Sequence, residues 1–112
     1  FQGMRLLNEE GDRIHRVTGH LPPLMFAPAR WLWFREHRPD VCARAAHLLM
    51  MPDWLTGRVC GELVSEPSAA AESGLLDVSE RDWSPGLLDS VGIPAGLLPR
   101  WWSHRWGSRG RP

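Results

Sequence analysis

The sequence predicts a mainly helical protein with a small β-element, an α+β fold organised around one core. Prolines stand at the start of several apolar segments with helical spacing, and proline is favoured at the first position of a helix. Two short segments in the second half of the chain, each bounded by turn residues, indicate strands. The 112 residues suffice for one modest core but not for two.

Two helices are expected before residue 38. Residues 6–17 place leucine, isoleucine and valine at helical spacing, although Gly11 weakens the centre of this helix by about 1 kcal/mol relative to alanine. After a proline-containing loop, residues 28–37 form the second helix. Its core-facing residues are expected to be Ala29, Leu32 and Trp33, with Arg30, Arg35 and Glu36 on the opposite side.

The next three segments are expected to be a helix, a strand and a helix. Pro39 opens a short helix that runs to about residue 46. The run over 47–51 is apolar and short, which favours a buried strand over a helix. Pro52 ends this run and opens a helix over 52–59.

The second half of the chain contains the predicted β-element and one further helix. Residues 62–66 alternate as a half-buried strand does, and residues 74–78 are its expected partner strand. Small residues over 68–73, mostly serine and alanine, connect the two. A serine followed by proline predicts the N-cap and the first position of a helix over 84–92, and a last turn follows over 94–98.

Three segments are expected along the chain. Residues 1–3 have the character of a tag remnant ahead of a native start at Met4. Residues 4–99 carry the predicted elements. Residues 100–112 are rich in tryptophan and arginine, show neither a repeat nor a helical period, and are expected to be irregular. Such a tail also suits nucleic acid or anionic lipid, which is the less favoured interpretation.

The composition excludes several kinds of chemistry. Thirteen basic residues balance thirteen acidic ones, so the net charge of zero provides no steering toward nucleic acid. Every basic residue is arginine, and the chain contains neither lysine nor tyrosine. Schiff-base lysines, P-loop lysines, Ser-x-x-Lys dyads and tyrosine acids are therefore excluded within these residues.

The histidines and cysteines do not predict a metal site. The five histidines lack the spacing of paired ligands, and Cys42 and Cys60 lie far apart without a CxxC motif. Cys42 is expected to pack as a small hydrophobic residue on a helix face. A reduced, cytoplasmic setting is expected, and no apolar run approaches the ~20 residues that span a bilayer.

Seven tryptophans are the most unusual feature of the composition. Trp31 and Trp33 lie on one predicted helix but two positions apart, so they do not face the same way and cannot form one stacking platform. Packing is therefore the favoured role of Trp33, Trp54 and Trp83, ahead of stacking on a sugar or a base.

Five motifs occur in order along the chain. They are Asp12-Arg13-Ile14 with Thr18-Gly19, Phe26-Ala27-Pro28 through Arg30 and Trp33 to Pro39, Asp53-Trp54-Leu55 through Gly61-Glu62, Ser65 to Asp77, and Arg81-Asp82-Trp83-Ser84 through Ile93. In this order and spacing the chain resembles the FGGY family of carbohydrate kinases, xylulokinases most closely, over residues 6–99. Arg30 stands where the family pattern has a lysine, and Ala69 where it has an aspartate.

The resemblance implies a fragment of a ribonuclease-H-like, actin-like kinase domain. The family's kinases use ATP and Mg²⁺ to phosphorylate a sugar or polyol hydroxyl in a cleft between two such domains. The family's D-x-G-T phosphate-binding turn and the G-G-x-D segment with its catalytic aspartate do not occur among these 112 residues. We therefore expect a fragment of a pentulose or polyol kinase that binds no cofactor and transfers no phosphate alone.

Two alternatives to this interpretation remain open. The first is a non-enzymatic protein-interaction or oligomerising module derived from a carbohydrate kinase, with the tryptophan- and arginine-rich tail as its anchor. The second is that the chain is one piece of an active kinase.

The resemblance also predicts which residues lie on the substrate side of the family's cleft. These residues are Phe26, Ala27, Pro28 and Arg30, and neither a catalytic residue nor a metal ligand is expected. In a complete kinase the segment would lie against the central sheet, so apolar faces around Trp33, Leu49 and Leu76 are expected to be uncovered. Exposed apolar patches favour association, so we expect a homo-oligomer or, as a second expectation, a complex with a protein partner, and neither nucleic acid nor a membrane.

Overall fold

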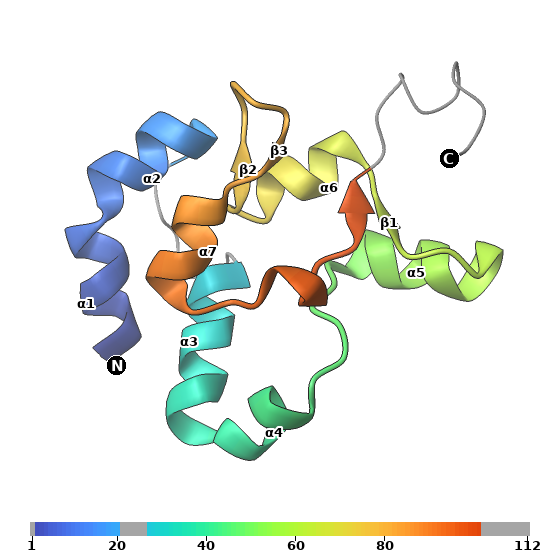
Figure 1. Cartoon of the computed structure of the whole chain (residues 1–112), viewed down its shortest axis with the longest axis horizontal. Helices are drawn as coiled ribbons and strands as arrows, with labels where there is room; N and C mark the ends of the chain where they lie inside the picture. Colours follow the sequence, from blue (N-terminus) through green and yellow to red (C-terminus); the bar gives the residue numbers. More distant parts are fainter. Residues whose placement is uncertain (1, 21–26, 102–112) are drawn as a thin grey trace.

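The chain is mainly helical, with four strands of two residues each in the part that the structure describes (Figure 1). The computed structural model describes residues 2–20 and 27–101. In chain order the elements are α1 (Gln2–Glu9), α2 (Gly11–Thr18), α3 (Ala27–His37), α4 (Pro39–Arg44), α5 (Met51–Cys60), β1 (Val64–Ser65), α6 (Pro67–Glu72), β2 (Leu76–Asp77), β3 (Asp82–Trp83), α7 (Pro85–Val91), the 3-10 turn η1 (Ala95–Leu97) and β4 (Arg100–Trp101). None of the described helices is long and apolar enough to cross a bilayer.

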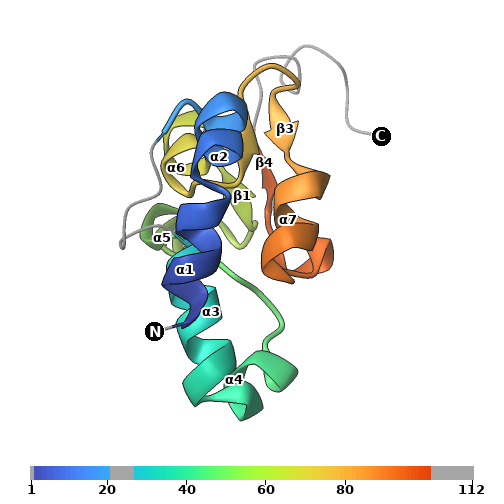
Figure 2. The same ribbon diagram turned by 90° about the vertical axis from the view of Figure 1, so that its left-hand side faces the viewer.

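The core lies where α1, α3 and α7 meet (Figures 1 and 2). It is formed by the buried side chains of Leu7, Ile14, Ala27, Ala29, Trp31, Leu32, Leu75, Leu87, Leu88, Val91 and Ile93. Two side chains of α3 also bond the end of α7. The Trp31 indole N–H donates to the Gly92 carbonyl at 3.1 Å, and the Arg35 guanidinium donates to the Val91 carbonyl at 3.1 Å. These bonds join segments that are more than fifty residues apart in sequence.

The predicted first helix is broken into α1 and α2. Glu10, with φ −90° and ψ 4°, forms the turn between them, directly before Gly11. The Ile14 N–H still donates to the Glu10 carbonyl at 2.9 Å, so the break is a local bend. Glycine's low helix propensity explains why the bend lies here.

The prediction that Trp33 faces the core is wrong, because Trp31 takes that place. Trp31 is 7 % exposed whereas Trp33 is 42 % exposed. Pro28, Trp31, Leu32 and Arg35 recur at i, i+3, i+4 and i+7, and this set faces the core and α7. Trp33 instead stacks on His37, with ring centroids 4.6 Å apart.

The predicted strand over 47–51 is also wrong. Residues 47–50 are extended without a partner strand in the described part of the chain, and α5 begins at Met51. The Leu48 N–H donates to the Leu97 carbonyl at 2.7 Å, which ties this segment to η1. A short apolar run does not specify its hydrogen-bond partner. Here the backbone bonds to the turn η1 and not to a neighbouring strand.

The strands pair differently from the prediction. β2 pairs antiparallel with β3, with Leu76 opposite Trp83, and β1 pairs in parallel with β4, with Val64 opposite Arg100. The connection over 68–73, for which no helix was predicted, forms most of α6. α6 lies between β1 and β2 in the chain, and these two strands pair with β4 and β3 instead of with each other.

Two helices begin at prolines, as the sequence predicts. The predicted helices at Pro39 and Pro85 are confirmed as α4 and α7. The Ser84 hydroxyl accepts the Leu87 N–H at 3.3 Å, and Gly92 ends α7 at φ 68°.

Leu76, expected to be uncovered, is 6 % exposed because it is packed in the β2–β3 pair. The predicted irregular tail begins with the strand β4, and residues 102–112 lie outside the described residues.

The contrast between Trp31 and Trp33 gives a test of this packing. Trp31→Ala should lower the free energy of unfolding by about 3–5 kcal/mol, because it empties a core site and leaves the Gly92 carbonyl without its donor. Trp33→Ala is the matched control and should cost less than about 1 kcal/mol. Urea unfolding followed by circular dichroism measures both, and equal losses would contradict the assignment.

Candidate functional site

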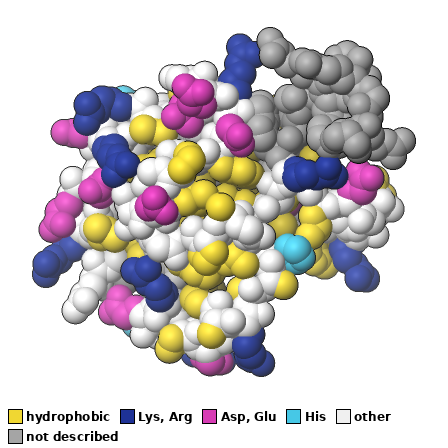
Figure 3. Space-filling view, in the orientation of Figure 1, with side chains coloured by type: hydrophobic (Ala, Val, Ile, Leu, Met, Phe, Trp, Pro, Cys, Tyr) yellow, Lys and Arg dark blue, Asp and Glu magenta, His cyan; other side chains and the backbone are white. Residues whose placement is uncertain are grey.

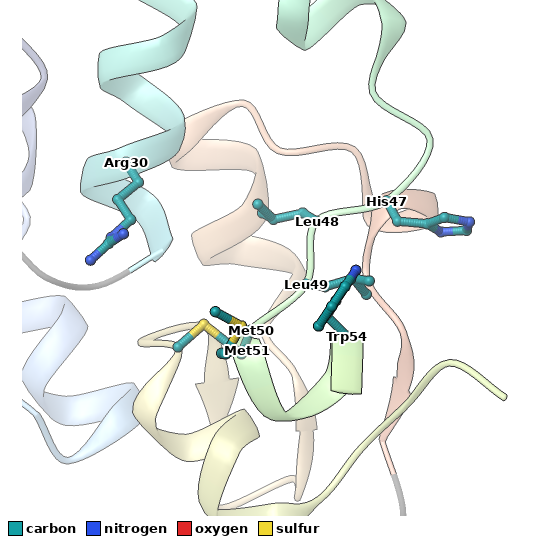
Figure 4. Close-up of a pocket in the computed structure, with 7 residues that line it drawn as sticks. All are labelled: Arg30, His47, Leu48, Leu49, Met50, Met51 and Trp54. Carbon is teal, nitrogen blue, oxygen red and sulfur yellow. The ribbon is translucent and has the colours of Figure 1, made fainter. Parts of the chain in front are cut away.

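An open hollow of about 620 Å³ lies between the first turn of α3 and the start of α5 (Figure 4). Its lining residues are Arg30, His47, Leu48, Leu49, Met50, Met51 and Trp54. Figure 4 shows Arg30 on one side of the 47–50 segment and His47 on the other. The hollow is of the size that small-molecule sites occupy, and it is mainly apolar with two polar side chains.

Among the described residues of the predicted substrate-side set, Arg30 alone lines the hollow. Ala27 and Pro28 are buried in the first turn of α3, where the Ala27 N–H donates to the Ser73 carbonyl at 3.2 Å. Phe26 lies outside the described residues. Arg30 is exposed and has no hydrogen-bond or ion-pair partner within the part of the chain that the structure describes. Its guanidinium is therefore free to meet an anion or a hydroxyl.

The hollow depends on Asp53, which the sequence analysis named only as the first residue of the third motif. Asp53 is 2 % exposed, and its Oδ2 accepts the Met50 N–H at 2.9 Å. This bond satisfies the N-cap of α5 and sets the angle at which the 47–50 segment enters the helix. Its Oδ1 is buried and has no partner among the described residues. The Pro-Asp pair at a helix start was the signal that could have predicted this role.

Glu66 has a similar capping role in the motif that begins at Ser65. Its carboxylate accepts the Ser68 N–H at 3.0 Å and the Ala69 N–H at 2.6 Å, and so caps α6. These bonds, from Ser68 first, lower the pKa of Glu66. Ala69 and Ala70 are buried, so the alanine at position 69 packs inside the fold.

The described residues bring no set of side chains together as a metal site. No group of three or more His, Cys, Asp or Glu side chains among them is placed to hold a metal ion. Asp53 and Glu66 accept backbone N–H groups, as do Asp77 and Asp82. Cys42 is partly buried against the core, as predicted, and Cys60 is exposed.

The packing roles predicted for three tryptophans have mixed outcomes. Trp83 is half-buried, and its indole N–H donates to the Pro99 carbonyl at 2.8 Å. Trp33 and Trp54 are instead 42 % and 51 % exposed. Trp54 lines the hollow.

The comparison with protein families is decisive. The model of the FGGY family of carbohydrate kinases, N-terminal domain, matches residues 2–104. The chain belongs to the FGGY family of carbohydrate kinases. The match includes the start of the tryptophan- and arginine-rich tail, beyond the span 6–99 on which the resemblance rested.

Curated relatives and solved structures agree with this family. The chain is 42 % identical over 87 residues to the autoinducer-2 kinase of Klebsiella pneumoniae subsp. pneumoniae and 41 % identical to that of Escherichia coli K12. It is similar to a xyloylose kinase from Brucella ovis, with a TM-score of 0.81 at 27 % identity over 88 % of this chain and 21 % of that one. A glycerol kinase from Plasmodium falciparum shares the fold at 16 % identity, with a TM-score of 0.78 over 92 % of this chain and 22 % of that one.

The chain spans a small part of these relatives. The aligned region covers 78 % of this chain but 16 % of each autoinducer-2 kinase. The fold described above is therefore that of one segment of the family's N-terminal domain.

The capping carboxylate of Glu66 predicts a pH-dependent contribution to stability. Glu66→Ala should lower the free energy of unfolding by about 1 kcal/mol at neutral pH. Because the folded pKa lies below the unfolded value, this stabilisation is present above the ordinary glutamate range and is lost as pH falls through the lowered pKa.

Urea unfolding of wild type and Glu66→Ala across this range measures the effect. Glu72→Ala, on the same helix and exposed, is the control and should change stability by less than about 0.5 kcal/mol. A loss at Glu66 that stays constant into acid would contradict the capping role.

Proposed function

We propose that this chain is a segment of the N-terminal domain of a carbohydrate kinase and supports the substrate side of its cleft. The observation that carries the proposal is the family match over residues 2–104, together with a fold that superposes on sugar kinases. The chain's own contribution is the hydrogen-bonded packing of α3 against the end of α7, with Arg30 at an open hollow.

The proposed substrate is a small polyhydroxylated molecule phosphorylated at a hydroxyl group. Proteins similar to this chain are described as autoinducer-2 kinase, xylulose kinase and glycerol kinase. A pentulose, a polyol and autoinducer-2 are therefore the candidates. Arg30 supports this substrate class because a guanidinium offers five N–H donors to hydroxyl or phosphate oxygens.

The chain by itself is proposed to be inactive. Phosphoryl transfer requires phosphate-binding donors, bound metal and a carboxylate that accepts the hydroxyl proton. The D-x-G-T and G-G-x-D segments are absent from these residues, and the described carboxylates form no metal cluster. The uncovered apolar side chains of α5 favour a second role, association with another protein surface.

A kinase assay tests the inactivity of the isolated chain. The purified chain is incubated with ATP, Mg²⁺ and, in turn, pentuloses, polyols and autoinducer-2. Nucleotide consumption should equal that of the no-substrate control. Turnover in the range of about 1–100 s⁻¹, as in ordinary kinases, would overturn this part of the proposal.

A chimeric kinase tests the proposal that this segment supports the substrate side of the cleft. The matching segment of an autoinducer-2 kinase is replaced by residues of this chain, and the chimera should retain kinase activity. Arg30→Gln in the chimera should lower kcat/KM about tenfold through lost hydrogen bonds to the substrate, while Arg30→Lys restores part of it.

Arg16→Gln is the matched control, because Arg16 is exposed on α2 and does not line the hollow. An inactive but folded chimera would contradict the assignment of the segment. An Arg30→Gln chimera as active as the Arg16→Gln chimera would contradict the role of Arg30.

A further inference from the structure

We propose that one buried water molecule binds between the side chains of Asp53 and Ser65 and links the start of α5 to β1. The water donates a hydrogen bond to Asp53 Oδ1 and accepts one from the Ser65 hydroxyl. It thereby fixes the carboxylate that holds the 47–50 segment beside the hollow. Both side chains are buried within this chain, so the inference does not rest on the proposed kinase function.

Asp53 is the one buried carboxylate among the described residues. Figure 3 shows other Asp and Glu side chains at the surface of the molecule, where solvent can hydrate them. Asp53 is 2 % exposed, and Ser65 is 0 % exposed. A buried carboxylate is stable only when its oxygens accept hydrogen bonds, so both oxygens of Asp53 require a donor.

Asp53 Oδ1 and Ser65 Oγ are the two buried side-chain polar atoms without a hydrogen-bond partner in the part of the chain that the structure describes. The other buried hydroxyl groups, those of Thr18, Ser73 and Ser84, all bond backbone groups. A fold that satisfies these hydroxyl groups and leaves one acceptor and one donor unpaired points to a partner that the two share.

The path of the chain places Ser65 opposite Asp53. Asp53 and Gly57 lie on one face of α5, because residues four apart in a helix share a face. Gly61 ends α5 at φ 75°, and the chain turns back, so that a Cβ atom on Gly57 would lie 2.6 Å from Leu63 Cδ2. Leu63 therefore faces α5, and Ser65, two residues further along the strand direction, faces the same way.

The lengths of the two segments agree with this placement. Four residues of helix cover about 6 Å, and two residues of strand cover about 6.6 Å, so β1 reaches the level of Asp53 at Ser65. α5 and β1 are in contact, and Figure 1 shows β1 beside α5. Asp53 Oδ1 and Ser65 Oγ do not bond each other. A water with two bonds of about 2.8 Å joins atoms up to about 5.5 Å apart, and it needs at least two polar partners.

The water site acts on the hollow through the second oxygen of the same carboxylate. Asp53 Oδ2 accepts the Met50 N–H at 2.9 Å, and Met50 lines the hollow. β1 is paired with β4, so the link joins this strand pair to the wall of the hollow. Ser65 is therefore a positioning residue, because it holds Met50 through the water and Asp53.

A crystal structure of the full chain, at a resolution that shows ordered water, tests the site directly. We expect a water oxygen within about 3.2 Å of both Asp53 Oδ1 and Ser65 Oγ. A direct bond between these two atoms, or a space between them without ordered water, would overturn the proposal.

Urea unfolding of the full chain measures the coupling between the two side chains. Ser65→Ala should raise the unfolding equilibrium constant about tenfold in the wild-type background, because the carboxylate loses its water-mediated donor. In the Asp53→Ala background the same change should have an effect of less than about twofold. Ser84→Ala is the matched control, since Ser84 is a buried serine with its own bond to the Leu87 N–H, and its effect should be equal in both backgrounds. An equal effect of Ser65→Ala in both backgrounds would contradict the link.

Amide hydrogen exchange covers the case in which Asp53→Ala does not fold. In Ser65→Ala, exchange of the Met50 N–H should rise about tenfold more than that of the Leu88 N–H, which bonds the Ser84 carbonyl in α7. Equal rises would mean a global loss of stability and would overturn the positioning role of Ser65. Failure of the kinase chimera would leave all three results unchanged, so the two proposals fail separately.

Discussion

The contact between α3 and the end of α7 is the constraint on which the rest of the structure depends. The last carbonyls of a helix have no partner within the helix, and here Trp31 and Arg35 supply donors to Gly92 and Val91. The Arg35 cation also lies at the negative end of the α7 dipole. The same Trp31 ring fills the core between α1, α3 and α7. One face of α3 thus packs the core and also donates hydrogen bonds to two carbonyls that would otherwise lack a partner.

Beyond α7, hydrogen bonds hold the 47–50 segment and the start of α5 in place. Leu97 lies just beyond α7 and accepts the Leu48 N–H, so the 47–50 segment is held without a sheet. Asp53 then binds the Met50 N–H and turns the chain into α5. The inner side of α5 is occupied by this buried carboxylate and by a glycine. The hollow beside Arg30 and the exposed apolar side chains of α5 are consequences of the same arrangement.

The chain corresponds to a small part of the FGGY kinases that it matches. The aligned part covers 16 % of the autoinducer-2 kinases and about a fifth of the solved sugar kinases. The segment retains its own packing, because its core bonds and caps are internal, but it brings neither phosphate-binding turn nor metal cluster among the described residues.

The sequence by itself determined the family, the helical character and those helix ends that are set by local chemistry. Ser84 with Pro85 and Gly92 bound α7 as predicted, because an N-cap hydroxyl and a left-handed glycine act within one turn of the backbone. The motif placed Arg30 among the expected substrate-side residues, and that role stays a prediction. Only the tertiary structure decided that Trp31 and not Trp33 is buried, that β2 pairs with β3, and that 47–50 bonds a turn. These choices depend on partners distant in sequence, and the spacing of apolar residues does not encode which partner is present.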